Sequence, residues 1–340
     1  MAKQLVFIVH GIGGADPGWS KPAVDALKKH YKSFKLAGNF GDRYEIKEIH
    51  YSAPLKKYWK EHDEVAASLK KLQVNSQAFH DAIVSLATSV PQDAMRSHIG
   101  DLFLYLSTAY NEMIALDVNI AVEKELIKRL FPTYSIIAHS LGTRVVFDTL
   151  QRSFSNKAKY TLRAKPRVLM MASDVTRLCS FNSNELKTRH GLRVFPSNSA
   201  AKGACQHFIN ACHPLDPIAV VRRYAPEFAL DANYHAPNIE PDDITQKDLH
   251  SLEHYCRHPA VAAAFFNQTI APDEFGSDPV SKSALTAALA KYREDTLGGN
   301  LATLKKEIEE LEPSKFKSWK ETVEKIAEIY ERIEKFRVSA

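Results

Sequence analysis

The residues with the clearest capacity for chemistry are a serine, an aspartate and two histidines that follow one another along the chain. Ser140 lies in Ala-His-Ser-Leu-Gly (138–142), directly after an apolar run, with small residues two positions before and two after it. A strand-to-helix turn that presents a nucleophilic serine is tight enough to require small residues there. The usual pattern has glycine at both positions, so Ala138 is a conservative departure. The alternative is that Ser140 only caps the next helix.

A serine becomes a nucleophile when a base takes its proton, another group orients that base, and donors stabilise the oxyanion. Asp216 lies on a predicted turn after an apolar run and is the favoured orienting acid, with a turn or helix cap as the alternative role. Asp174, which follows the preceding apolar run, is the competing acid. His250 and His254 are the candidate bases, and their spacing alone does not decide between them.

The glycine-rich turn His-Gly-Ile-Gly-Gly (10–14) follows the first apolar run and is the candidate oxyanion site. Gly11 and Ile12 belong to this turn, and the backbone N–H groups of Ile12 and Leu141 are the predicted donors. His10 is expected to order the turn rather than to transfer protons. A phosphate-binding loop is the alternative, but the Gly-x-Gly-x-x-Gly spacing and the Lys-Ser/Thr pair of nucleotide-binding loops are absent.

A metal site is the main alternative for the two histidines, because histidines four residues apart on a helix can chelate zinc. His250 and His254 supply only two ligands, and the residues between them do not form the His-Glu-x-x-His motif. The predicted chemistry therefore requires neither a metal nor a cofactor.

Short apolar runs and helical patterns alternate along most of the chain and must position these residues. The predicted strands cover 4–9, 44–51, 134–138, 167–172 and 206–212, and the predicted helices near them cover 20–33 and 143–155. Ser20 is the expected N-cap of the first helix, with Pro22 in its first turn. This alternation is typical of an α/β fold with a mostly parallel sheet flanked by helices.

A helical stretch separates the second and third predicted strands. Residues 54–130 are predicted to form a helical insertion, either a cap over one end of the sheet or a separate layer. An apolar stripe at three- and four-residue steps marks one helix face: Leu102, Leu106, Ala109, Met113, Leu116, Ile120, Ile127 and Leu130. The apolar segment 101–110 favours an acyl-binding pocket, with simple packing on the sheet as an equal alternative.

The last part of the chain, 281–340, is predicted to be a helical extension that ends in an antiparallel hairpin after the breaker Gly-Gly-Asn (298–300). Each helix of the hairpin has one apolar stripe, which must pack on the body or on another chain, so a homo-oligomer through these helices is one hypothesis. The predicted domains are 1–280, including the insertion at about 54–130, and 281–340.

Composition narrows the protein class further. The 340 residues are 45% hydrophobic and 25% charged with a net charge of +5, which fits a globular protein and, with charges interspersed, gives no indication of a nucleic-acid partner. The apolar run at 5–9 is too short for a secretion signal, and no run is long enough to span a bilayer. We therefore expect a cytoplasmic protein whose four cysteines, without a Cys-x-x-Cys pair, are reduced.

Together these segments resemble the α/β-hydrolase superfamily, specifically its lipase- and esterase-like members. The segments that carry the resemblance are VHGIGG (9–14), AHSLGT (138–143), NACHPLDPIA (210–219) and HSLEHYCRHPAV (250–261). In the last segment, the resemblance implies that His250 is the base and that Tyr255 packs beside it. The resemblance covers roughly 4–265. Because few residues precede the first predicted strand, the two strands that usually open the superfamily sheet are expected to be missing.

The resemblance implies a serine hydrolase that cleaves a carboxylic ester or related acyl bond. Ser140 is the expected nucleophile, His250 the base, and Asp216 the acid that orients it. The expected substrate is an acyl ester, with lipids included. Two other hypotheses remain at this point: a non-catalytic scaffold whose hairpin binds a partner, and an effector phospholipase directed at lipids.

Overall fold

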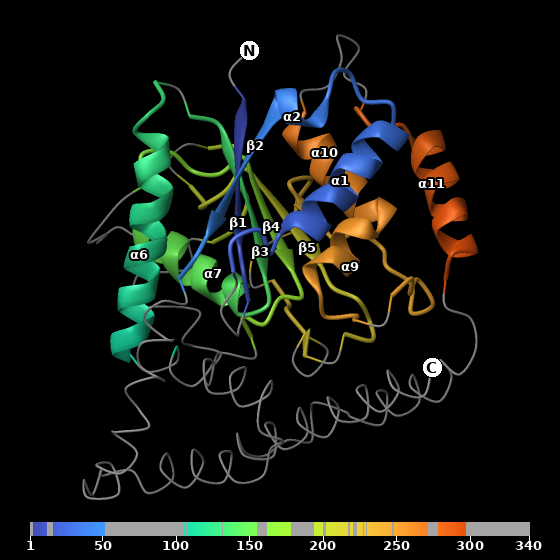
Figure 1. Cartoon of the computed structure of the whole chain (residues 1–340). Helices are drawn as coiled ribbons and strands as arrows, with labels where there is room; N and C mark the ends of the chain where they lie inside the picture. Colours follow the sequence, from blue (N-terminus) through green and yellow to red (C-terminus); the bar gives the residue numbers. More distant parts are fainter. Residues whose placement is uncertain are drawn as a thin grey trace, which may run out of the picture.

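The computed structural model describes residues 3–11, 16–51, 105, 108–130, 132–154, 162–177, 194–199, 202–216, 218–219, 223–226, 228, 230–246, 248–270 and 278–296. Its centre is a six-stranded sheet with the order β2-β1-β3-β4-β5-β6, in which every neighbouring pair is parallel (Figure 1). The strands are β1 (Gln4–Val9), β2 (Tyr44–Ile49), β3 (Tyr134–His139), β4 (Val168–Ala172), β5 (His207–Ala211) and β6 (Tyr234–His235). The predicted α/β class with a parallel sheet is confirmed.

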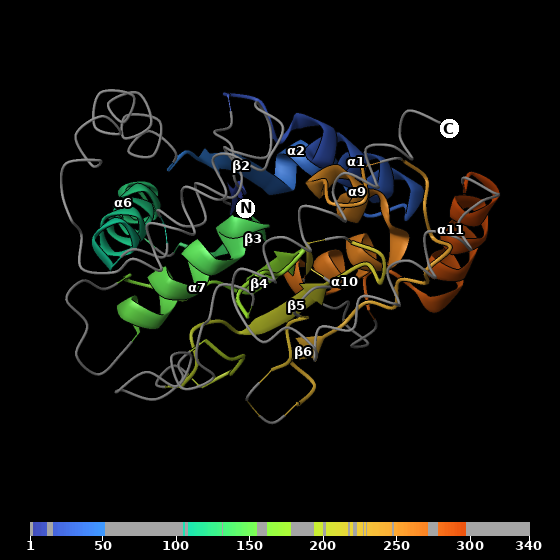
Figure 2. The same cartoon turned by 90° about the horizontal axis from the view of Figure 1, so that it is seen from below.

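Helices cover both faces of this sheet. α6 (Thr108–Leu126) and α7 (Leu141–Ser153) lie on one side, and α1 (Lys21–Ser33), α9 (Leu252–Arg257) and α10 (Pro259–Thr269) lie on the other (Figure 2). The short α2 (Phe40–Arg43) precedes β2, and α11 (Lys282–Glu294) packs on α10. Parallel strands with both faces covered are expected to be apolar throughout rather than alternating.

The core therefore divides into two layers. Successive strand residues point to opposite faces, so Leu5, Phe7 and Val9 pack with the α6 and α7 side while Val6 and Ile8 pack with the α1, α9 and α10 side. The central strands β1 and β3 are buried along their whole length. This rigid sheet fixes the carboxyl ends of its strands relative to one another.

The five predicted strands all form, with ends that differ by at most two residues, and the sixth strand, β6, was not predicted from the sequence. Its two residues are too few to carry a periodic pattern. The first helix begins after Ser20 as expected, but the Ser20 side chain does not cap it. Ser20 Oγ instead donates to Glu48 Oε1 at 2.7 Å, which ties the start of α1 to β2.

The predicted insertion at 54–130 is described only at Tyr105 and from 108 onward, and most of the apolar segment 101–110 lies outside the described side chains. The members of the predicted stripe whose side chains are described within α6, Met113, Leu116 and Ile120, lie on one exposed face, and the opposite face packs on the core. The side chains on that buried face include Ile114, Ala115, Val118, Val122 and Leu126. Both faces of α6 satisfy a three- and four-residue apolar spacing, so the spacing alone could not show which of them is buried.

α11 is fixed to the body although the predicted boundary at 280/281 places it in the extension. Arg293 Nε donates to Asp243 Oδ1 at 2.9 Å, and Tyr292 OH donates to the Asp243 carbonyl at 3.2 Å. The predicted hairpin after 298–300 lies outside the described residues. Within the described chain, none of the helices combines the length and apolarity needed to cross a bilayer.

Candidate active site

Ser140 occupies the turn between β3 and α7 in a backbone conformation that few residues adopt. Its φ is 53° and its ψ is −129°, and non-glycine residues at positive φ are uncommon outside special turns. Its N–H donates to Ala172 O at 3.1 Å, and its carbonyl accepts from Thr143 N–H at 2.9 Å, so both sides of the turn are held. Because its side chain makes no capping hydrogen bond, the hypothesis that Ser140 serves as a helix cap is wrong.

Glycine is required next to Ser140 because two backbones meet there. A Cβ on Gly142 would lie 2.3 Å from His10 O and 2.7 Å from Val9 O. A Cβ on Gly11 would lie 2.7 Å from Ser140 Cβ and 3.1 Å from Ser140 Oγ. The glycines of two distant motifs therefore allow the end of β1 to approach the serine turn.

The turn after β1 is held by Tyr51. The Tyr51 hydroxyl lies 2.9 Å from both His10 O and Gly11 O and donates to this pair of carbonyls. The His10 ring stacks on the Tyr51 ring with centroids 4.3 Å apart, and its Nδ1 donates to Gly11 O. This agrees with the expected role of His10 in ordering the turn. Ile12, the predicted oxyanion donor, lies outside the described residues.

Ser140, His250 and Asp216 form a continuous chain of contacts, called here the Ser–His–Asp group. Ser140 Oγ lies 2.8 Å from His250 Nε2. On the other side of the ring, His250 Nδ1 lies 3.0 Å from Asp216 Oδ1 and 3.2 Å from its Oδ2. These three residues come from the ends of β3 and β5 and from the segment before α9, so the fold joins positions far apart in sequence.

Asp216 is fully buried and its carboxylate is fully engaged. Its Oδ1 accepts the backbone N–H groups of Ile218 at 3.0 Å and Ala219 at 3.1 Å, which close the turn after β5. Its Oδ2 accepts from the hydroxyl of Tyr255, which in turn accepts from His213 N–H at 3.3 Å. A buried carboxylate with this many donors is held in one orientation.

The two ionisable partners shift each other's pKa values in the direction that base catalysis requires. Burial lowers the pKa of His250, but the charge and hydrogen bond of Asp216 outweigh burial and raise it above 6.5. For Asp216, burial raises the pKa, yet the His250 charge and hydrogen bond together with the Tyr255 hydroxyl hold it well below 3.8. Asp216 therefore remains a carboxylate around neutral pH.

Ser173, one residue past the end of β4, is a further member of this cluster. Its side chain is fully buried, its φ is 53°, and its Oγ lies 2.8 Å from His250 Nδ1. Its hydroxyl also donates to Asp216 and helps to lower the pKa of that carboxyl. Ser173 therefore lies between the histidine and the acid, and sequence analysis did not identify it. The one available indication was a serine directly after a buried strand, as at Ser140.

The remaining candidates fall outside the contact chain. His254 is buried and packs against the rings of His213 and Tyr255, and burial lowers its pKa to about 3. The structure thus places His250, rather than His254, against Ser140. Asp174, the competing acid, accepts a hydrogen bond from Thr176 N–H at 2.7 Å. Among the described contacts it has no hydrogen bond with His250, and burial raises its pKa.

His139 contributes in a way that the sequence did not indicate. Its Nε2 donates to the backbone carbonyl of His250. Burial lowers the pKa of His139 to about 3, so its ring stays neutral around neutral pH, with its one proton on the Nε2 that donates. His139 therefore holds the backbone of His250 and, through it, the position of the His250 imidazole.

Leu141 is the first residue of α7, and its N–H is one of the four at a helix start that have no acceptor within the helix. It follows Ser140 directly, at the positive end of the helix dipole. An oxyanion formed on a carbonyl attacked by Ser140 would lie beside this end of α7. The position fits the predicted oxyanion role of Leu141, and Gly11 borders the same space.

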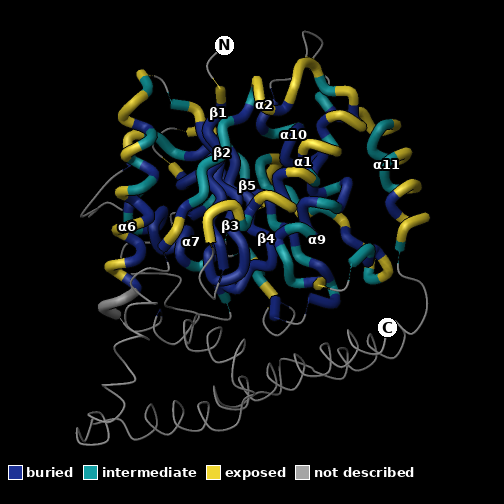
Figure 3. Tube along the Cα trace, viewed as in Figure 1, coloured by how far each residue is buried: buried dark blue, intermediate teal, exposed yellow. Residues whose placement is uncertain are grey.

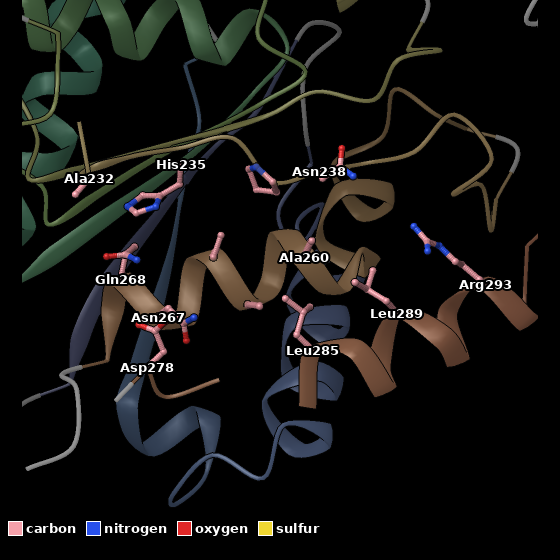
Figure 4. Close-up of a pocket in the computed structure, with 13 residues that line it drawn as sticks. Ala232, His235, Asn238, Ala260, Asn267, Gln268, Asp278, Leu285, Leu289 and Arg293 are labelled. Carbon is pink, nitrogen blue, oxygen red and sulfur yellow. The ribbon is translucent and has the colours of Figure 1, made fainter. Parts of the chain in front are cut away.

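Other features of the described residues lie away from the Ser–His–Asp group. Within the described segments, there is no group of three or more His, Cys, Asp or Glu residues that could hold a metal ion. A cavity of about 580 Å³ lies between α10, α11 and the segment around β6 (Figure 4), and Ser140, His250 and Asp216 are absent from its lining. Cys205, Cys212 and Cys256 are free thiols.

Comparison with known protein families, with curated proteins and with solved structures found no match for this chain. The function must therefore be inferred from the fold and from the geometry of its residues.

Proposed function

We propose that this protein is a serine hydrolase that cleaves a carboxylic ester or a related acyl bond, with an α/β-hydrolase fold. The observation that carries the proposal is the contact chain from Ser140 Oγ through His250 to the buried carboxylate of Asp216, at 2.8 Å and 3.0 Å. A nucleophile in contact with a base that is itself oriented by an acid defines this mechanism more reliably than any sequence motif.

The topology supports the same proposal. The sheet order β2-β1-β3 means that the chain reverses direction across the sheet between β1 and β3. Ligands of open parallel sheets bind at the carboxyl ends of the strands beside such a reversal. Gly11 follows β1 and Ser140 follows β3, so both candidate elements meet at that position. The chain order serine, aspartate, histidine is also that of the α/β-hydrolases.

In the proposed reaction, Ser140 Oγ attacks the carbonyl carbon of the substrate and its proton passes to His250 Nε2. The carboxylate of Asp216 stabilises the resulting imidazolium and keeps Nδ1 protonated. The N–H of Leu141, with a second N–H from the glycine-rich turn, binds the oxyanion. His250 then protonates the leaving alcohol, and water attacks the acyl-enzyme by the same steps in reverse.

Hydrolysis of a graded series of p-nitrophenyl acyl esters by the full-length protein tests this function. We expect turnover that is lost in Ser140→Ala, while Ser173→Ala, the neighbouring serine that also contacts His250, retains measurable turnover. A folded wild-type protein that hydrolyses none of the esters would favour the scaffold hypothesis instead.

The same series tests the substrate class. A preference for long acyl chains supports the hypothesis of a lipid ester as substrate, and activity confined to acetyl and butyryl esters contradicts that hypothesis. Phospholipid vesicles that release fatty acid only with wild-type protein would support the effector phospholipase hypothesis.

A further inference from the structure

α6 has an apolar face on each side. One side packs on α7 and the sheet, as described above. The opposite side, together with the turn after Leu126, carries five large hydrophobic residues that are between 38% and 92% exposed, called here the outer stripe: Met113, Leu116, Ile120, Ile127 and Leu130. Exposed and buried positions alternate along α6 at the edge of the molecule (Figure 3).

The outer stripe is unusual within this molecule. Six large hydrophobic residues are exposed among the described side chains, and five of them are the outer stripe; the sixth is Leu230. Single exposed hydrophobics are normal, but a contiguous patch marks an interaction surface. An apolar stripe on a helix normally packs against another surface, and α6 has two such stripes on opposite faces. A further surface is therefore expected to cover this side of α6.

The spacing of the outer stripe is nearly symmetric. Met113 and Leu130 lie at equal distances from a midpoint between residues 121 and 122, and so do Leu116 and Ile127. Ile120 lies next to that midpoint. A twofold axis through it would set α6 antiparallel to α6 of a second copy, with Leu116 near Ile127, the first residue after the helix, and with Leu130, which lies past the end of the helix, on the side of Met113. Such self-complementarity is what a twofold-symmetric interface requires.

Two charges beside the stripe are complementary across the same axis. Asp117 and Lys124 lie seven residues apart on one flank of α6, and neither forms an ion pair within the described part of the chain. Burial raises the pKa of Asp117, as expected for a carboxyl without a nearby cation. In the antiparallel arrangement, Asp117 of each copy comes within about two residues of register, or about 3 Å along the helix, of Lys124 of the other.

We propose that two copies of this chain associate through the outer stripe, with their α6 helices antiparallel and with Asp117 paired to Lys124 in both directions. The 19 residues of α6 span about 28 Å. One helix face of this length gives an interface at the low end of the range for specific complexes. We therefore expect a reversible, concentration-dependent dimer.

Sedimentation velocity of the full-length protein over a range of concentrations tests the proposal. We expect a reversible dimer in the wild type, and a monomer for Ile120→Glu, which places two charges at the centre of the interface. Lys29→Glu, a charge reversal at an exposed position on α1 across the sheet, is the control and should dimerise normally.

Charge exchange provides a test that does not depend on the apolar core of the interface. Asp117→Lys and Lys124→Asp should each raise the Kd by about tenfold, because each sets like charges opposite one another. The double variant restores both pairs and should dimerise as the wild type does. An equimolar mixture of the two single variants should form a heterodimer, since each supplies the charge that the other lacks.

Three results would overturn the proposal. A wild type that stays monomeric at all concentrations contradicts it directly, and binding of that monomer to phosphatidylcholine–phosphatidylglycerol vesicles, lost in Ile120→Glu, would assign the stripe to a membrane surface. A monomeric wild type that loses thermal stability in Ile120→Glu would instead assign it to another segment of the same chain. A double charge variant no tighter than the single variants would refute the pairing.

Discussion

Ser140 and Ser173 occupy equivalent positions on adjacent strands and contact opposite nitrogens of the same imidazole. Each has a φ of 53° and follows the last residue of its strand, and each donates its N–H to a carbonyl at the end of the next strand, Ala172 O for Ser140 and Ala211 O for Ser173. Ser140 Oγ contacts His250 Nε2, whereas Ser173 Oγ contacts Nδ1, both at 2.8 Å.

The element that comes after each serine separates their proposed roles. Ser140 leads into α7, whose first N–H groups have no acceptor within the helix. Ser173 leads into a turn, and its hydroxyl points to the buried Asp216. The same residue in the same backbone conformation can thus serve as a nucleophile or as a support for the acid. The elements around it decide which.

The largest expected effect comes from removing the first serine. Ser140→Ala should lower kcat by about a millionfold, because the nucleophile of a serine hydrolase acts as a unit with its base. Steady-state hydrolysis of a p-nitrophenyl ester measures this. Retention of a tenth or more of the wild-type rate would contradict the assignment of Ser140 as the nucleophile.

The second effect tests the acid that lies beside Ser173. Asp216→Asn should lower kcat by about ten-thousandfold, because the amide no longer holds the required tautomer of His250. In the wild type, kcat/KM should fall as pH decreases through the raised pKa of His250, which lies above 6.5. Removing the Asp216 charge leaves burial dominant, so the residual activity should fall at a lower pH. A pH profile that does not move would contradict the coupling.

The third effect tests the close approach of Gly11 to Ser140. Gly11→Ala would place a methyl group 2.7 Å from Ser140 Cβ. A displacement of about 1 Å at the nucleophile can cost about a hundredfold in rate. Gly41→Ala is the matched control, since a Cβ there meets nothing within 4 Å. The prediction is refuted if both variants keep wild-type kcat.

The smallest effect comes from the second serine. Ser173→Ala should lower kcat about tenfold with KM unchanged, the loss typical of one buried hydrogen bond to a charged group. Ser173→Gly removes the same hydroxyl but suits the positive φ, so it should be thermally more stable than Ser173→Ala with an equal loss of kcat. If Ser173→Gly kept full kcat, backbone conformation rather than the hydroxyl would explain the effect.

The sequence predicted the features that depend on local pattern. Apolar runs located β1, β3, β4 and β5, because strands buried on both faces are apolar throughout, and an alternating pattern located β2. Small residues around Ser140 predicted the turn. Asp216 was preferred to Asp174 because it follows the later strand and lies nearer to the histidines, and His250 was preferred to His254 only through the resemblance to the α/β-hydrolases. Of these features, the strands and the serine turn depend only on a residue and its near neighbours.

The remaining features depend on contacts between distant segments. Ser173 joins the cluster because β4 lies beside β3 and β5, and Tyr51 orders the turn at Gly11 from 40 residues away. The four-residue spacing of His250 and His254 could not show which of them contacts Ser140. In the structure they do not share a helix, because His250 lies in the turn before α9 and His254 lies inside α9. The buried face of α6 could not be chosen because both of its faces are apolar.

Labelling with a fluorophosphonate probe, followed by mass-spectrometric mapping of the adduct, tests the central proposal most directly. The probe reacts with serines whose hydroxyl is activated, so it separates Ser140 from Ser173 without any assumption about substrate. We predict an adduct on Ser140 alone in the wild type and in Ser173→Ala, and none in Ser140→Ala. An adduct on Ser173, or no adduct on a folded wild-type chain, would contradict the proposed role of Ser140.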